Sequence, residues 1–179
     1  MKRVRVLGSG GAGKSTFPRQ LGEITGLPVI HLDAEYWRPG WVEPPKAEWA
    51  ARVAQLAGEE RWIMDGNYGG TMPERIAAAD TVVFLDLPRT TCLWSVLKRR
   101  FRYRGRARPD MTEGCDERLT LAFLKWVWDY PKTRRPEILA SLRGAGADGT
   151  RGIRLRSRKA MARFRPGLAE EADGATAAG

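Results

Sequence analysis

The sequence is poor in the residues that build metal sites and disulfide frameworks. Among its 179 residues there are two cysteines, Cys92 and Cys115, and one histidine, His31. Two thiols and one imidazole are too few for a Cys/His zinc site or for a small disulfide-stapled domain. These classes are therefore excluded, and we interpret both cysteines as inert filling residues.

Long apolar runs are also missing. No stretch of about eighteen apolar residues occurs, which excludes a membrane-spanning helix. The first three residues, Met-Lys-Arg, lead directly into a short apolar strand without the apolar core of a signal peptide. We therefore expect a cytoplasmic protein, and its length fits about one domain with a proper core.

Acidic residues are in the minority, with 21 Asp and Glu against 31 Lys and Arg, for a net charge of +10. Such a balance indicates anionic partners, either nucleotide phosphates or nucleic acid. Much of the excess lies in two internal runs, residues 98–108 and 151–165, and this favours phosphates. A solvated helix face is the alternative for the second run. No helix-turn-helix, zinc-finger or RNA-binding signature occurs, so nucleic acid is not the favoured partner.

Glycine, by contrast, is concentrated in residues 8–15, which read GSGGAGKS between an apolar run and a stretch that can form a helix. Glycines allow such a turn to point several backbone N–H groups at an anion. This is the P-loop pattern, in which Lys14 reaches the β- and γ-phosphates of ATP and Ser15 holds Mg²⁺. The predicted nucleotide-binding residues are Gly8, Gly10, Gly11, Ala12, Gly13, Lys14, Ser15 and Thr16.

Strand and helix patterns alternate along the chain. Strands are predicted at 3–7, 29–31, 62–64, 81–85 and 153–155, and helices at about 13–25, 45–57, 73–79, 90–100, 116–142 and 158–164. This alternation is typical of a five-stranded parallel sheet with helices on both faces, in which ligands bind at the carboxyl ends of the strands.

Three predicted strands are followed by an aspartate: Asp33, Asp65 and Asp86. A lone aspartate at such a place is usually a turn former, but three of them indicate a site shared with Lys14 and a metal ion. Whether Asp65 or Asp86 orients the water on the metal stays open at this point. Pro18 lies inside the first predicted helix, where it should cost roughly 3 kcal/mol, so Pro18→Ala is predicted to raise thermal stability.

The segment that follows Asp33 is rich in aromatic residues, reading YWRPGW over 36–41. Its proline and glycine disfavour regular structure, and its rings are of the kind that stack on planar ligands. Trp37 and Trp41 are therefore candidates for recognition of a phosphate acceptor, and simple packing of this segment is the alternative.

Five further segments follow the P-loop in order: HLDAEYWRPGW, WIMDGNY, VVFLDLP, KRRFRYRGRARPDM and FLKWVWDYPKTRRP. With them, the chain resembles the topology modulation protein family, an adenylate-kinase-like branch of P-loop nucleotide kinases, over residues 3–164. The resemblance implies the three-layer α/β fold of nucleoside monophosphate kinases. It also implies a single domain over 1–168 with a flap at about 33–60, a short lid at about 99–115 and a disordered tail at 169–179.

The likeness to adenylate kinases also implies roles for individual residues. Asp65 looks like the acidic strand end that orients Mg²⁺ through water, and Asp33 like its partner. Arg99 resembles the lid-hinge arginine, and Arg134 or Arg135 resembles the arginines that close on the transferred phosphoryl group. Leu155 to Arg158, with Arg156 as the candidate cofactor-binding residue, lies where such kinases hold the adenine. Where adenylate kinases have Phe-Pro-Arg after the Asp-Gly pair, this chain has Asn67 and Tyr68, so Tyr68 joins the candidate acceptor site in place of an arginine.

The sequence thus predicts an ATP- and Mg²⁺-dependent kinase that moves the γ-phosphoryl group to a small acceptor, with a nucleoside monophosphate favoured. The missing arginine leaves a non-nucleotide metabolite, such as a sugar acid, as an alternative acceptor. A third reading is an ATP-dependent switch protein associated with DNA.

Overall fold

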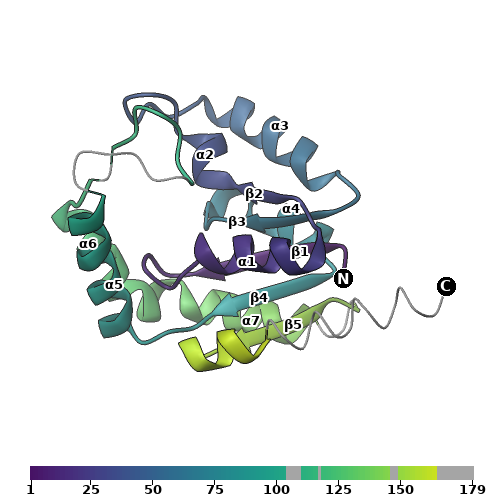
Figure 1. Ribbon diagram of the computed structural model, residues 1–179. Helices are drawn as coiled ribbons and strands as arrows, with labels where there is room; N and C mark the ends of the chain where they lie inside the picture. Colours follow the sequence, from purple (N-terminus) through teal and green to yellow (C-terminus); the bar gives the residue numbers. More distant parts are fainter. Residues whose placement is uncertain (104–109, 117, 146–148, 165–179) are drawn as a thin grey trace.

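A five-stranded parallel sheet forms the centre of the computed structural model, which describes residues 1–103, 110–116, 118–145 and 149–164 (Figure 1). Its strand order is β2-β3-β1-β4-β5, and every neighbouring pair is parallel. The strands are β1 Arg3–Gly8, β2 Val29–His31, β3 Trp62–Asp65, β4 Thr81–Leu85 and β5 Arg151–Leu155. The predicted five-stranded α/β fold is confirmed, and each strand lies close to its predicted bounds.

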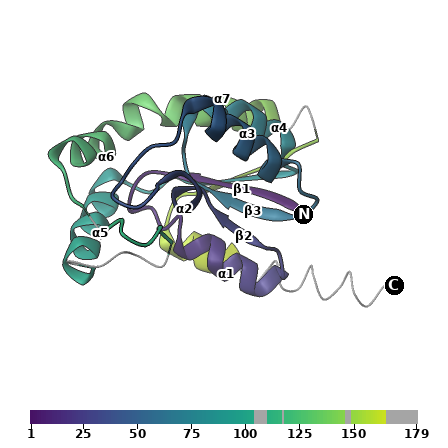
Figure 2. The same cartoon turned by 90° about the horizontal axis from the view of Figure 1, so that it is seen from above.

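Helices cover both faces of the sheet and one of its ends. They are α1 Thr16–Thr25, α2 Leu32–Tyr36, α3 Lys46–Ala57, α4 Met72–Ala78, α5 Arg89–Arg102, α6 Leu121–Thr133 and α7 Arg135–Ala145. Residues 158–164 are also helical, and a 3₁₀ turn spans Gly69–Thr71. Seen from above, α1 lies on one side of the sheet and α3, α4 and α7 on the other, while α5 and α6 stand together at one end (Figure 2). No described helix is long and apolar enough to cross a membrane.

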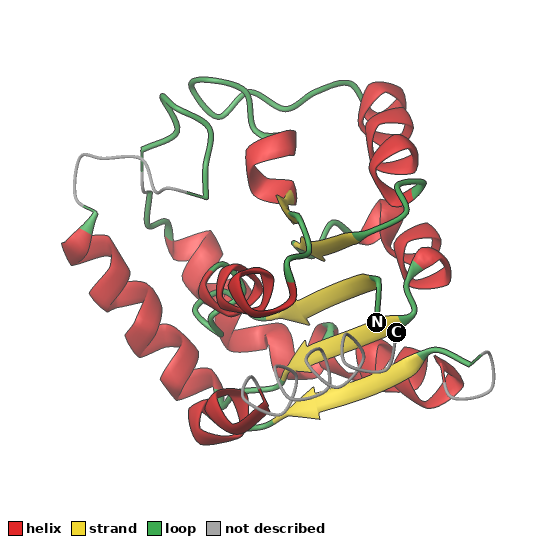
Figure 3. Cartoon of the chain, turned by 45° about the vertical axis from the view of Figure 1, so that its right-hand side comes forward, coloured by secondary structure: helices red, strands yellow, loops and turns green. Residues whose placement is uncertain are grey.

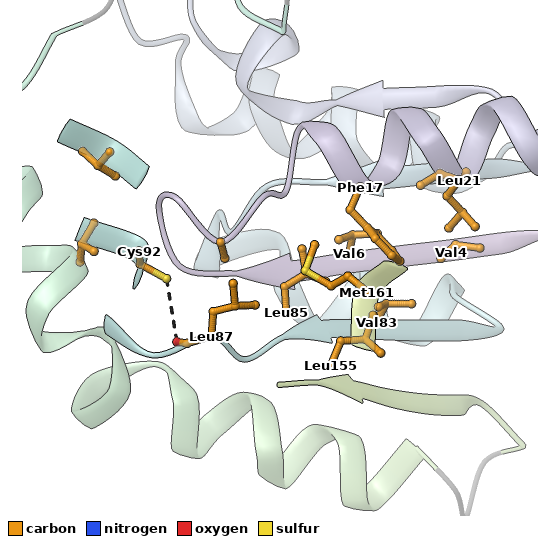
Figure 4. Close-up of a cluster of buried hydrophobic side chains, with 14 of the residues drawn as sticks. Val4, Val6, Phe17, Leu21, Val83, Leu85, Leu87, Cys92, Leu155 and Met161 are labelled. Carbon is orange, nitrogen blue, oxygen red and sulfur yellow. Dashed lines mark hydrogen bonds between the residues drawn. The ribbon is translucent and has the colours of Figure 1, made fainter. Parts of the chain in front are cut away.

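One core lies between the sheet and α1 (Figure 4). Val6 of β1 and Val83 of β4 contact it from the sheet, Phe17 of α1 from the helix, and Met161 from the segment at 158–164. Cys92, at the start of α5, is fully buried at the edge of this cluster beside the P-loop. The P-loop therefore leaves a strand that is packed from this side by two separate helical segments.

A second core lies on the opposite face of the sheet. Trp62 and Met64 of β3 pack there with Trp49 and Val53 of α3 and with Ile138 of α7. The central strands are thus buried on both faces, which explains why β4 reads as a continuous apolar run rather than an alternating one. All strands point the same way, so their carboxyl ends meet at one edge (Figure 3).

Two predicted helix starts and one predicted loop were wrong. The first helix begins at Thr16 rather than near residue 13. The helix expected from about residue 116 begins at Leu121, because the Thr120 hydroxyl accepts a hydrogen bond from the Phe123 N–H at 3.1 Å and caps it. The one-turn helix α2 follows β2 directly, so it contains Asp33, expected at the end of the strand, and the first residues of the segment expected as a loop after it. Part of the expected lid, 104–109, and the expected tail, 169–179, lie outside the described residues.

Pro18 lies in the first turn of α1, since that helix begins at Thr16. The first four N–H groups of a helix have no acceptor within it, so a proline there removes no helical bond. The premise that Pro18 lies beyond the first turn was therefore wrong. We now expect Pro18→Ala to lower the free energy of unfolding by about 0.5–1 kcal/mol, because proline restricts the unfolded chain. Thermal unfolding followed by circular dichroism checks this, and a Tm above the wild-type value would contradict it.

Asp80 ties the start of β1 to the start of β4. Its Oδ2 accepts hydrogen bonds from the N–H groups of Lys2 at 2.6 Å and Arg3 at 2.9 Å. Burial alone would raise the pKa of this carboxyl, but these backbone bonds outweigh burial and hold the pKa below its usual value. A lowered pKa stabilises the fold above the ordinary aspartate pKa, and the contribution is lost as the pH falls through the folded pKa.

We therefore expect Asp80→Asn to lower the free energy of unfolding by about 1 kcal/mol near neutral pH. The difference from wild type should begin to shrink below about pH 4, where the carboxyl becomes protonated in the unfolded chain, and should be lost once the pH falls below the lower pKa of the folded state. Urea unfolding of both proteins over this pH range measures it. A difference that stays constant across the range would show that the charge of Asp80 is not involved.

Candidate functional site

A cavity of about 650 Å³ opens at the carboxyl edge of the sheet. Six predicted residues of the P-loop line it: Gly10, Gly11, Gly13, Lys14, Ser15 and Thr16. Six predicted residues from elsewhere in the chain line it as well: Asp33, Trp37, Trp41, Asp65, Tyr68 and Arg99. The volume falls within the usual range for small-molecule sites.

Packing of α5 and α6 against the P-loop sets its backbone shape. Gly11 and Gly13 have positive φ angles of 77° and 98°. A Cβ on Gly11 would lie 2.2 Å from the carbonyl oxygen of Cys92, and one on Gly10 would lie 2.7 Å from Phe123 Cζ. A side chain at Gly11 would therefore have to displace the backbone of α5, and one at Gly10 would have to displace the ring of Phe123 on α6. Gly8 and Ala12 do not line the cavity, because Gly8 ends β1 and Ala12 is fully buried.

Lys14 places its ammonium group at the loop, where Nζ donates a hydrogen bond to the carbonyl oxygen of Ser9 at 2.9 Å. Burial lowers the pKa of Lys14, and the nearby carboxylates of Asp33 and Asp65 act in the opposite direction. A buried cation of this kind gains from an anion beside it, because the anion offsets the loss of hydration. This geometry suits a phosphate group.

Asp65 ends β3 directly beside the P-loop strand, in register with Val6 of β1 and His31 of β2. Its Oδ1 lies 3.2 Å from Nδ1 of His31. Burial raises the pKa of the Asp65 carboxyl, while His31 and Lys14 act to lower it. Burial would lower the pKa of His31, but the bond to Asp65 outweighs burial and raises it. The only histidine of the chain therefore supports Asp65, a role that its sequence position does not reveal.

Tyr68 connects the segment after β3 to Asp33 of α2. Its hydroxyl donates to Asp33 Oδ1 at 2.8 Å, and burial together with this carboxylate raises the pKa of Tyr68. Asn67 Nδ2 donates to the carbonyl oxygen of Gly8 at 2.9 Å. These two residues therefore link the segment after β3 to Asp33 of α2 and to the end of the P-loop strand.

Two buried arginines hold this segment from beneath, and sequence analysis missed both. Arg75 donates to the carbonyl oxygens of Gly66, Asn67 and Tyr68 at 3.2, 3.1 and 2.6 Å. Arg5 donates to the carbonyl oxygens of Met64, at 3.2 Å, and Gly66. Both side chains are fully buried, and burial lowers the pKa of each, that of Arg75 to about 10. A charged residue within the apolar strand RVRVLG was the available signal for Arg5.

Asp110 was also missed, and it reaches the P-loop from the far side of the cavity. The Ser15 hydroxyl donates to its Oδ2, although the two residues are 95 positions apart. Within the described ranges, no group of three or more His, Cys, Asp or Glu side chains could hold a metal ion alone. A hydroxyl with nearby carboxylates fits Mg²⁺, which keeps several waters and binds largely through substrate phosphates.

The arginines near the carboxyl edge of the sheet fall into two groups, those that line this cavity and those that do not. Besides Arg99, the cavity is lined by three basic side chains that sequence analysis did not assign to the site, Lys98, Arg102 and Arg118, and by Arg158, the last residue of the segment expected to hold adenine. Three predicted arginines do not line it: Arg134, which pairs with Glu137 at 3.5 Å, Arg135, and Arg156.

Asp86 also lies away from the cavity, although it follows a strand as Asp65 does. Its carboxylate is bound by Arg135 Nε at 2.9 Å and by Arg154 Nε at 2.7 Å. The negative charge of Asp86 is therefore paired with two guanidinium groups. Of the two aspartates proposed for the water on the metal, Asp65 is the one that lines the cavity.

The aromatic segment forms one wall of the cavity. Trp37 and Trp41 make an edge-to-face contact with ring centroids 5.2 Å apart. Trp41, whose φ is 67°, donates its indole N–H to the carbonyl oxygen of Asp116 at 3.1 Å, and the Arg118 guanidinium lies 5.8 Å from its ring centroid. These contacts hold the half-buried indole of Trp41 against residues that precede α6.

Of the comparisons with known proteins, the one with solved structures bears on the fold. No protein-family model matches the chain, and no curated protein sequence matches it. Among solved structures, shikimate kinase from Acinetobacter baumannii in complex with shikimate is similar over 96% of this chain and 90% of that one, with 15% identity and a TM-score of 0.53. A gluconokinase from Sinorhizobium meliloti 1021 aligns over 95% and 97%, with 14% identity and a TM-score of 0.48. The chain has the fold of the P-loop kinases.

Proposed function

We propose that this protein is an ATP-dependent kinase that transfers the γ-phosphoryl group to a small-molecule acceptor. The observation that carries the proposal is one cavity in which Lys14 and Ser15 of the P-loop share the space with Asp33 and with the pair Trp37 and Trp41. A P-loop alone serves switches and kinases alike. A second set of polar and aromatic side chains in the same cavity supplies a place for an acceptor.

The chemistry asks the protein mainly to align the reactants and to supply positive charge. Lys14 binds the phosphate oxygens, and Arg99 and Arg158, which line the same cavity, stabilise the charge that develops on the transferred group. Ser15, and Asp65 through water, would hold Mg²⁺, which would supply positive charge at the phosphates. Arg134, Arg135 and Arg156 do not line this cavity, so we assign them no part in the transfer.

The acceptor side favours a planar or polyhydroxylated molecule. A nucleoside monophosphate would stack its base on Trp37 or Trp41 and place its phosphate near Arg118. A non-nucleotide metabolite is the second candidate, favoured by the Tyr68–Asp33 pair, which offers hydrogen bonds to hydroxyl groups. The similar shikimate kinase holds shikimate, which supports a small acceptor without choosing between the two. We also propose that the chain belongs to the topology modulation protein family and folds as one domain with a flap and a lid.

A panel of acceptors scored by ADP formation tests the proposal. Nucleoside monophosphates and sugar acids are each added to the protein with ATP and Mg²⁺, and the product is identified by phosphorus NMR. Acceptor-dependent ADP formation with transfer of the phosphoryl group supports the kinase. Slow hydrolysis that no acceptor stimulates would overturn it and would favour an ATP-dependent switch.

A further inference from the structure

A second cavity, of about 460 Å³, lies where β4 and β5 end, between the start of α5 and the junction of α6 with α7. None of the residues that line it lines the larger cavity. Its charged side chains come from four separate parts of the chain: Asp86, Arg89, Lys132, Arg135, Arg154 and Arg156. Five cations therefore surround a single carboxylate.

The carboxylate at the centre organises two of these cations. Asp86, whose side chain is only 9% exposed, binds Nε of Arg135 and Nε of Arg154, so both guanidinium groups are held at the cavity wall. One carboxylate can neutralise only one of the two charges. The remaining charge is fixed in place, and this lowers the entropy cost of binding an anion.

The other three cations have no carboxylate partner within the described residues. Arg89 is held over the ring of Trp128, 4.2 Å from its centroid. Lys132 and Arg156 are exposed. Asp129 interacts with Arg89 and Lys132 through charge without forming an ion pair with either; its carboxylate is bound by Lys125, and it does not line the cavity. The first turn of α5, which carries no acidic residue, adds the positive end of its helix dipole.

We propose that this cavity binds an oligophosphate, meaning an anion with two or more linked phosphate groups. Guanidinium groups match phosphate oxygens in pairs, and four of the five cations are arginines. A single phosphate would not engage cations that come from α5, α6, α7 and the end of β5 across 460 Å³. The phosphate chain belongs either to a free inorganic oligophosphate or to a nucleotide.

The test uses Lys14→Ala as the background, so that phosphate binding at the P-loop does not contribute and the proposed kinase function is not needed. Sodium tripolyphosphate is titrated into this protein by calorimetry at about 150 mM salt, where long-range charge effects are screened. We expect one binding site. Adding Lys132→Ala and Arg156→Ala, both exposed positions, should weaken binding by at least about tenfold.

A matched protein that instead carries Lys46→Ala and Arg61→Ala loses the same charge at exposed positions elsewhere and should bind as the background does. Equal weakening in both proteins, or no binding heat in the background, would overturn the proposal. Competition with ATP in the absence of Mg²⁺ shows whether the phosphate chain that binds this cavity belongs to a nucleotide or to an inorganic oligophosphate. Displacement of tripolyphosphate shows that nucleotides occupy the cavity, and its absence shows that inorganic oligophosphate does.

Discussion

Replacing Lys14 with alanine is expected to lower kcat for phosphoryl transfer by about 10³-fold or more. The ammonium group is the cation of the P-loop itself, and a positioned cation on the transferred group contributes about 10³ to 10⁵ in rate. Lys14 is held at its place by a hydrogen bond to Ser9, and its pKa is lowered by burial, so it gains most from a bound phosphate. Measurement of ADP formation at saturating ATP and acceptor gives the loss directly.

The matched control is Lys46→Ala, which removes an exposed lysine at the start of α3, away from the cavity. Its kcat should equal that of wild type within about twofold, since surface substitutions have little effect. Circular dichroism and thermal unfolding establish that both variants are folded. A folded Lys14→Ala protein with wild-type kcat would show that the P-loop does not carry the reaction.

Replacing Arg75 with methionine is expected to lower the free energy of unfolding by about 3 kcal/mol. Arg75 lies at the base of the segment that carries the site, and its five hydrogen bonds go to Thr71 and to the carbonyl oxygens of residues 66–68. Methionine keeps much of the volume but makes none of these bonds. The carbonyl oxygens of Gly66 and Tyr68 then keep only the bonds from Arg5 and Thr71, and each buried polar group left without a partner costs about 1–3 kcal/mol. Urea unfolding measures the change.

The same substitution should also reduce activity under conditions where the protein is still folded. Gly66 has a φ of 115°, and the segment it begins carries Tyr68, which binds Asp33. Arg61→Met serves as the control, because Arg61 is exposed just before β3. A stability equal to that of the control would show that water replaces the guanidinium and that Arg75 does not hold the segment.

Sequence patterns predicted the strands and most of the helices, because their signals are local. The apolar run at 81–85 and the glycine-rich turn at 8–15 each depend on neighbouring residues alone. Helix starts were predicted less well. The cap on α6 depends on the Thr120 hydroxyl, and a helix as short as α2 leaves little periodic signal.

Side-chain partners across the fold could not be predicted in this way. Arg156 and Arg158 are two positions apart, yet Arg156 lines the smaller cavity and Arg158 the larger one. Asp65 and Asp86 both follow a strand, yet only Asp86 is met by two arginines, from α7 and β5. In each case the cavity or the partner that the side chain contacts depends on which distant element packs beside it.

By itself, the sequence determined the five-stranded parallel sheet and the edge at which the P-loop, Asp33 and Asp65 would meet. Backbone preference and the spacing of apolar residues depend only on residues close together in the sequence. Only the tertiary structure decided which arginines enter the cavity, that Asp110 binds Ser15, and that buried guanidinium groups support residues 66–68. Those contacts join residues many positions apart in the sequence. Their strength depends on how deeply the groups are buried and not on their spacing in the sequence.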